Sequence, residues 1–99
     1  MQQPNIDYTK PRFELGVTLV TPAALAALEA AKLPEVLLLA RHVHGDWGEL
    51  SEDDRLQNEL AVLLGLRILS SYPIPTGGKV WIITEADRSA TTILLPDDY

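Results

Sequence analysis

The chain has 99 residues and a formal net charge of −6; 46% of its residues are hydrophobic and 22% are charged. This length and composition are typical of one small folded domain and exclude an intrinsically disordered chain. There is no cysteine, which excludes disulfides, a thiol nucleophile and cysteine-ligated metals and favours a cytoplasmic location. The negative charge disfavours general binding to nucleic-acid backbones.

The start of the chain differs in composition from the remainder. Residues 1–12 contain two prolines and few apolar residues, so we expect a flexible N-terminal arm and no signal peptide. Residues 13–99 are expected to form a single domain. The longest apolar run, 23–28, is too short to span a bilayer, and no membrane association is expected.

The first half of the domain is predicted to contain one strand and three helices. Alternation of apolar residues over 13–20, among them Val17 and Leu19, fits a half-buried strand. Thr21 and Pro22 are typical of a helix start. A second helix over 34–43 is apolar nearly all round, and we expect it to be the most buried.

A third helix is predicted to begin at Ser51, whose side chain can cap the first turn, and to end at Gly65. Four leucines are expected to form its buried stripe: Leu56, Leu60, Leu63 and Leu64.

The last third of the chain changes to a period of two residues. Strands are predicted over 66–72, 80–85 and 90–95, joined by turns at 73–78 and 86–89. Short connections indicate an antiparallel meander. The predicted fold class is therefore α+β: one β-strand, three helices, then a three-stranded antiparallel meander, with the helices packed on one face of the sheet.

His42, His44 and Asp46 form an H-x-H-x-D string, a ligand set that zinc can use. No third histidine is present, and two histidines near a helix C-terminus also interact well with its partial negative charge. We favour the helix end and predict no metal. The chain has no phosphate-binding loop or dinucleotide motif, and no cofactor is expected.

A metal-independent ribonuclease site is the alternative hypothesis. His42 or His44 would accept the 2′-hydroxyl proton, and Arg67 and Arg88 would neutralise the transition state. Tyr72, Thr91 or Thr92 could donate hydrogen bonds. This hypothesis requires those side chains to converge around one cleft.

Two further stretches have a structural and a functional interpretation. Trp47, between Gly45 and Gly48, is expected to fold back over the core, although Asp46, Trp47 and Tyr72 are also candidate binding residues. The segment 85–89 is interpreted as a hairpin turn with a solvated ion pair, in preference to an anion site built on Arg88.

Three stretches of the chain resemble a family of small uncharacterised proteins, often called plasmid-related, of plasmids and integrative elements. They are residues 41–48, Asn58 with 67–72, and 81–96. The resemblance implies an accessory role in mobile genetic elements. The order of elements also resembles, at the level of fold alone, the barnase-EndoU-colicin-RelE group of ribonucleases.

These observations favour a noncatalytic module that binds a protein partner through the acidic third helix or an exposed sheet edge, with a homodimer as one outcome. An RNA-cleaving domain is the alternative, and RNA is a partner only under that hypothesis. A further alternative is an anti-restriction or anti-defence protein that imitates DNA with its acidic belt, residues 49–59.

Overall fold

The computed structural model describes residues 5–99, so residues 1–4 of the predicted arm lie outside it. The elements in chain order are β1 (Val17–Val20), α1 (Pro22–Ala31), α2 (Glu35–Val43), α3 (Glu52–Leu64), β2 (Ile68–Pro73), β3 (Lys79–Thr84), β4 (Ala90–Leu94) and the short 3-10 helix η1 (Pro96–Asp98). The α+β class and the predicted order of strand, three helices and three strands are confirmed. Within this described part, no helix is long and apolar enough to cross a membrane.

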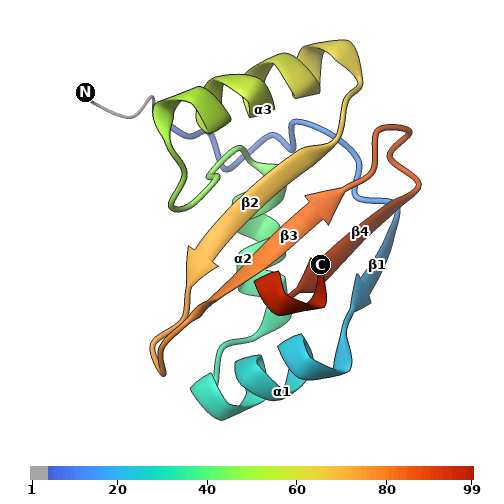
Figure 1. Ribbon diagram of the computed structural model, residues 1–99. Helices are drawn as coiled ribbons and strands as arrows, with labels where there is room; N and C mark the ends of the chain where they lie inside the picture. The colour runs from blue at the N-terminus through green and yellow to red at the C-terminus, as the bar shows by residue number, and fades with distance from the viewer. Residues whose placement is uncertain (1–4) are drawn as a thin grey trace.

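The four strands form one sheet in the order β1-β4-β3-β2 (Figure 1). β2, β3 and β4 are antiparallel neighbours, which confirms the meander. β1 is parallel to β4, so the sheet is mixed rather than purely antiparallel. The helices make this pairing possible, because parallel neighbours need a long crossover, and here the crossover includes all three helices and the first two strands of the meander.

Local signals set the helix boundaries as the sequence predicts. The hydroxyl of Thr21 accepts a hydrogen bond from the Ala24 amide at 3.2 Å, and Ser51 caps α3 through the Asp54 amide at 3.1 Å. Gly65 ends α3 with a φ of +68°, a conformation that glycine adopts without strain.

The helices cover the sheet unequally. α2 lies across one face, whereas α1 and α3 lie at opposite ends of the sheet (Figure 1). The main core joins α1 and α2 to that face and consists of Ala24, Leu28, Leu38, Tyr72, Ile74, Val80, Ile82 and Ile93. A smaller core of Trp47, Ala61 and Ile68 joins α3 to the end of the same face.

Two expectations about burial are wrong. β1 is not half-buried, because Val17 and Leu19 are 64% and 52% exposed. The strand is also shorter than predicted, since Gly16 turns at a φ of +66° with its backbone against Ser89. α2 is also not buried all round, since Val36 and Leu37 in its first turn face solvent. Apolar composition alone did not identify the inward face in either element.

α3 is reversed relative to the prediction. Its four leucines are exposed, and the buried residues are Asn58 and Ala61. The Asn58 side-chain amide donates to the Leu69 carbonyl at 2.6 Å and its oxygen accepts from the Leu69 amide at 3.1 Å. Asn58 thus continues the hydrogen bonding of the sheet beyond its edge strand β2 and turns the leucines outward.

Replacing Asn58 with alanine is expected to lower the free energy of unfolding by about 2–3 kcal/mol, because a backbone N–H and a C=O at the β2 edge lose their partner. Urea denaturation followed by circular dichroism measures this loss. The neighbouring exposed residue provides the control, since Gln57→Ala is expected to change stability by less than about 0.5 kcal/mol. Equal effects of the two substitutions would contradict the role given to Asn58.

Candidate functional site

The candidate catalytic residues His42 and Thr91 belong to one buried hydrogen-bond network. His42 is fully buried at the end of α2, with Nδ1 2.6 Å from the Ser70 hydroxyl and Nε2 2.9 Å from the Thr84 hydroxyl. The Thr84 hydroxyl lies 2.6 Å from that of Thr91, which donates to the Leu15 carbonyl at 2.7 Å. Helix, meander and the segment before β1 are therefore joined through one imidazole.

The direction of these hydrogen bonds defines the state of His42. Because Thr91 donates to a carbonyl, it accepts from Thr84, and Thr84 in turn accepts from Nε2–H of His42. Nδ1 then accepts from Ser70, so the imidazole is neutral with both nitrogens satisfied. Burial, assisted by the charge of Arg88, lowers the pKa of His42 to about 3 and maintains this neutral form.

Arg88 joins the hairpin between β3 and β4 to the end of α3. Its guanidinium donates to the carbonyls of Ala61 and Leu66 at 2.9 and 2.6 Å, and to two carbonyls of its own turn. The hairpin is confirmed, but these carbonyl contacts replace the expected solvated ion pair. A cation at this position also suits the partial negative charge of the α3 C-terminus.

The other two candidate catalytic residues lie apart from this network. Arg67 is half exposed and contacts Glu85 and the Tyr99 hydroxyl, at 3.2 and 2.9 Å. The Nδ1 atom of His44 is 2.6 Å from the Ala40 carbonyl, a helix-end contact. The structure therefore brings His42 and Thr91 together, away from solvent, and places Arg67, Arg88 and His44 in three different surroundings.

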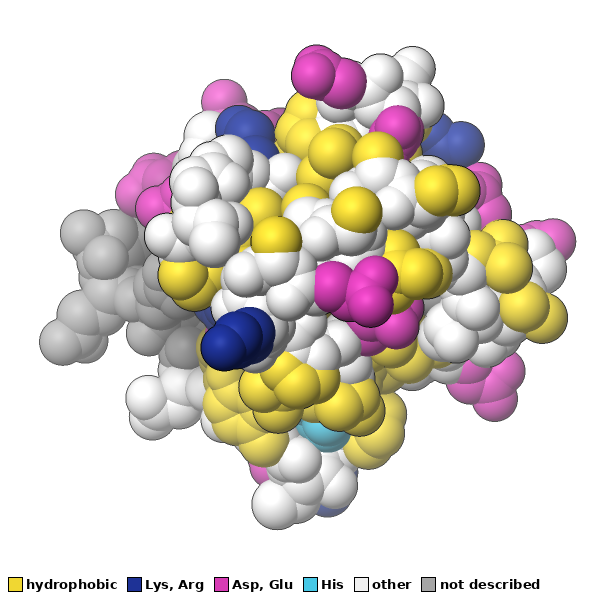
Figure 2. Space-filling model, turned by 90° about the horizontal axis from the view of Figure 1, so that it is seen from below, with side chains coloured by type: hydrophobic (Ala, Val, Ile, Leu, Met, Phe, Trp, Pro, Cys, Tyr) yellow, Lys and Arg dark blue, Asp and Glu magenta, His cyan; other side chains and the backbone are white. Residues whose placement is uncertain are grey.

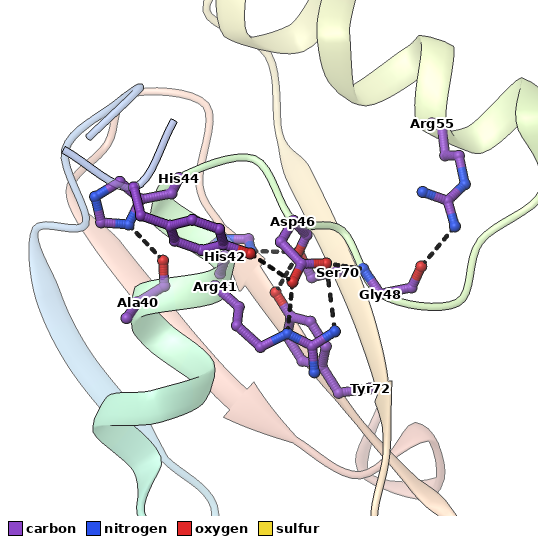
Figure 3. A network of polar contacts seen from close by, with 10 residues as sticks. Ala40, Arg41, His42, His44, Asp46, Gly48, Arg55, Ser70 and Tyr72 are labelled. Atoms are coloured by element: carbon purple, nitrogen blue, oxygen red, sulfur yellow. Dashed lines mark hydrogen bonds and ion pairs between the residues drawn. The ribbon is translucent and has the colours of Figure 1, made fainter. Parts of the chain in front are cut away.

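Asp46, a candidate binding residue, organises the loop after α2 (Figure 3). Its carboxylate accepts from Arg41 at 2.7 Å and from Tyr8 at 3.0 Å, and its carbonyl accepts from the Tyr72 hydroxyl at 2.6 Å. Burial alone would raise the pKa of Asp46, but the Arg41 hydrogen bond and charge outweigh it and hold the pKa below its usual value. The Arg41 guanidinium also lies over the Tyr72 ring.

Trp47 is 3% exposed and folds over the smaller core, as predicted. Its indole N–H donates to Glu59 at 2.9 Å, and Arg12 binds the same carboxylate through two hydrogen bonds. A cleft of about 390 Å³ lies beside this ion pair, lined by residues 5–7, 10–12, His44, Gly45 and Glu59. Of the candidate catalytic residues only His44 lines it, so the cleft lacks the groups that the ribonuclease hypothesis requires.

The surface that the sequence reasoning missed is the outer side of α3. We name it the α3 apolar face and define it as Leu56, Leu60, Leu63, Leu64 and Leu66. These side chains are 59%, 39%, 79%, 66% and 48% exposed. One feature of the sequence could have indicated this exposure: Asn58 is a polar residue in the middle of the helix, and at helical periodicity it lies on the side opposite the leucines.

Among residues 5–99, no group of three histidine, cysteine, aspartate or glutamate side chains is placed to hold a metal ion. Comparison of the chain with protein-family models, with curated proteins and with solved structures found no match.

Proposed function

We propose that this protein is a noncatalytic protein-interaction module that binds its partner through the α3 apolar face. The observation that supports this proposal is the exposure of five leucines, one of them 79% exposed, four on α3 and one directly after its cap. Apolar surface gathered in this way is characteristic of protein interaction sites. The accessory role in mobile elements, which the plasmid-related resemblance implies, is part of the proposal.

The exposure of the leucines is maintained by specific contacts on the opposite side of α3. Asn58 is bound to the β2 edge, and Arg55 donates to the carbonyls of Leu50 and Gly48 at 3.2 and 2.7 Å. Arg88 holds the last turn. Rotating α3 to bury its leucines would break these hydrogen bonds, so the apolar face stays in solvent until a partner covers it.

The two ends of the molecule differ in the character of their surfaces. On the end that carries α1, hydrophobic side chains are interrupted by acidic and basic ones (Figure 2). On α3 four exposed leucines share the outer side, and the acidic residues Glu52 and Asp53 lie in the first turn of the same helix. An apolar centre with charges at its margin is the usual arrangement in protein interfaces.

The buried network around His42 also supports a noncatalytic function. A general base must reach the proton that it removes, whereas His42 has no exposed surface and both its nitrogens are occupied. Arg88 uses its guanidinium to hold main-chain carbonyls. These residues have structural roles that account for their positions, and the geometry gives the ribonuclease hypothesis no support.

Site-specific photo-crosslinking in living cells tests the proposal. A photoreactive residue at position 63 is expected to crosslink to one protein partner and give a single product of defined mass. The same residue at the exposed control position 79 is expected to give no such product. A second substitution on the face, Leu56→Glu, is expected to abolish the adduct from position 63. Equal adduct formation from positions 63 and 79, or an adduct that survives Leu56→Glu, would refute the proposal.

A further inference from the structure

We infer that the partner of the α3 apolar face is a second copy of this chain, bound with the two α3 helices antiparallel across a two-fold axis between Leu56 and Leu60. The inference rests on the proposed function and adds the identity of the partner. It follows from the spacing of the side chains along the helix and from the charges at the two ends of the row.

The spacing is that of a helix-pairing seam. Asp53, Leu56, Leu60 and Leu63 follow one another at intervals of three, four and three residues, the alternation by which paired helices place side chains along a shared line. All three leucines are exposed, and Asp53 is exposed at the start of the row. A second helix can therefore lie along this line without moving any buried residue.

The row is also complementary to itself when it is reversed. In an antiparallel pair centred between Leu56 and Leu60, the row maps onto itself, and each Leu56 lies opposite Leu60 of the second copy. Asp53 at the start of one α3 then lies by the end of the other α3, which Arg67 follows after Gly65. A two-fold interface requires such reciprocity, because each contact between two positions occurs twice.

The charges agree with this orientation. The first turn of α3 is acidic, with Glu52, Asp53 and Asp54, and its last turn carries no basic residue. Two basic groups lie at that end: Arg88 is bound to main-chain carbonyls, and Arg67, two residues beyond Gly65, has a side chain that is 51% exposed. Its contacts with Glu85 and Tyr99 use two N–H groups, and a guanidinium has five. A parallel pair would instead place the two acidic turns together.

The size of the face sets the expected affinity. α3 has 13 residues and is about 20 Å long, so one helix pair buries less than a standard protein interface. We expect a reversible dimer with a dissociation constant on the order of 10–100 µM. The protein is therefore monomeric in dilute solution and dimeric at high concentration.

Sedimentation equilibrium across this concentration range tests the seam. Leu60→Glu and Leu63→Glu are each expected to raise the dissociation constant by at least about 100-fold. Val36→Glu is the matched control: Val36 is 67% exposed on α2, and its substitution should change the constant by less than about threefold. Circular dichroism checks that each variant is folded. A wild-type chain that stays monomeric, or Leu variants that still associate, would overturn the inference.

A charge exchange tests the antiparallel orientation. Asp53→Arg and Arg67→Asp each bring like charges together at both ends of the pair, so either variant alone is expected to associate at least about fivefold more weakly. In an equimolar mixture of the two variants, positions 53 and 67 of the paired chains again carry opposite charges at both ends, and dimerisation is expected to recover. Asp54→Arg, one position off the seam, should not complement Arg67→Asp. Failure of the mixture to recover would refute this orientation.

The mass of the crosslinked adduct separates this inference from the proposed function. An adduct of twice the chain mass from position 63 supports the homodimer. A specific adduct with a different protein leaves the proposed function standing and refutes the second copy as partner. Absence of any specific adduct refutes the proposed function as well.

Discussion

Replacing Gly48 with alanine is expected to lower the free energy of unfolding by at least about 3 kcal/mol. Gly48 has a φ of +76°, and a Cβ atom built there would lie 2.0 Å from the Ser71 carbonyl oxygen and 2.7 Å from the Tyr72 ring. The loop is held against β2 by two backbone hydrogen bonds, from Glu49 to Ser71 at 2.7 Å and from Ser71 to Trp47 at 3.0 Å. An alanine side chain would push the loop from the strand and break these bonds.

Gly65→Ala is the matched control for this substitution. Gly65 has a similar φ of +68°, but a Cβ atom there would meet nothing within 4 Å. Its replacement therefore adds only the strain of a left-handed conformation, about 1 kcal/mol. Urea denaturation of both variants measures the difference. If the two losses were equal, backbone conformation rather than the close approach to β2 would account for the role of Gly48.

The features that the sequence predicts well are those encoded locally. Thr21, Ser51 and Gly65 mark helix boundaries through contacts within a few residues, and the strands of the meander show their period within single segments. The parallel pairing of β1 with β4 has no such marker. This pairing depends on where the last strand of the meander lies relative to β1. It joins residues that are far apart in the chain, such as Val17 and Ala90.

The orientation of α3 shows why periodicity alone identifies a stripe without assigning it to the core. Four leucines at helical spacing are expected to face inward in a chain considered alone. In this fold the other side of α3 faces inward, because Asn58 is bound to Leu69 of β2 and Ala61 packs in the smaller core. These contacts arise only after the meander forms beside α3, so the helix sequence by itself could not reveal them.

The candidate catalytic residues were chosen for the chemistry of their side chains, whereas the partners of each side chain depend on the fold. His42 meets Ser70 and Thr84, which follow it by 28 and 42 residues in the chain. Neither partner carried a signal in the sequence, since buried hydroxyls in strands are common. His42 and Thr91 are connected through Thr84, but all three side chains are buried, and the network therefore has a structural role.

Lowering the pH from 7 to 5 is expected to reduce the stability of the protein by about 2 kcal/mol through His42 alone. The pKa of His42 is about 3 in the folded protein and 6.5 in the unfolded chain, because burial disfavours the charged imidazole. Between these values the unfolded chain binds a proton that the folded protein does not. Stability is therefore complete above about pH 7 and is lost as the pH falls through 6.5, with a slope near 1.4 kcal/mol per pH unit.

Urea denaturation at several pH values, compared between two histidine variants, isolates this effect. His42→Gln is expected to remove most of the dependence between pH 7 and 5, and His44→Gln, at the end of α2, to retain it. Asp46 and Glu59 have pKa values held below their usual range, so their contribution is lost only at lower pH. The measurement also bears on function. A slope that disappears in wild-type protein would mean that His42 titrates near neutrality in the fold, as a general base does, and would return the ribonuclease hypothesis to consideration.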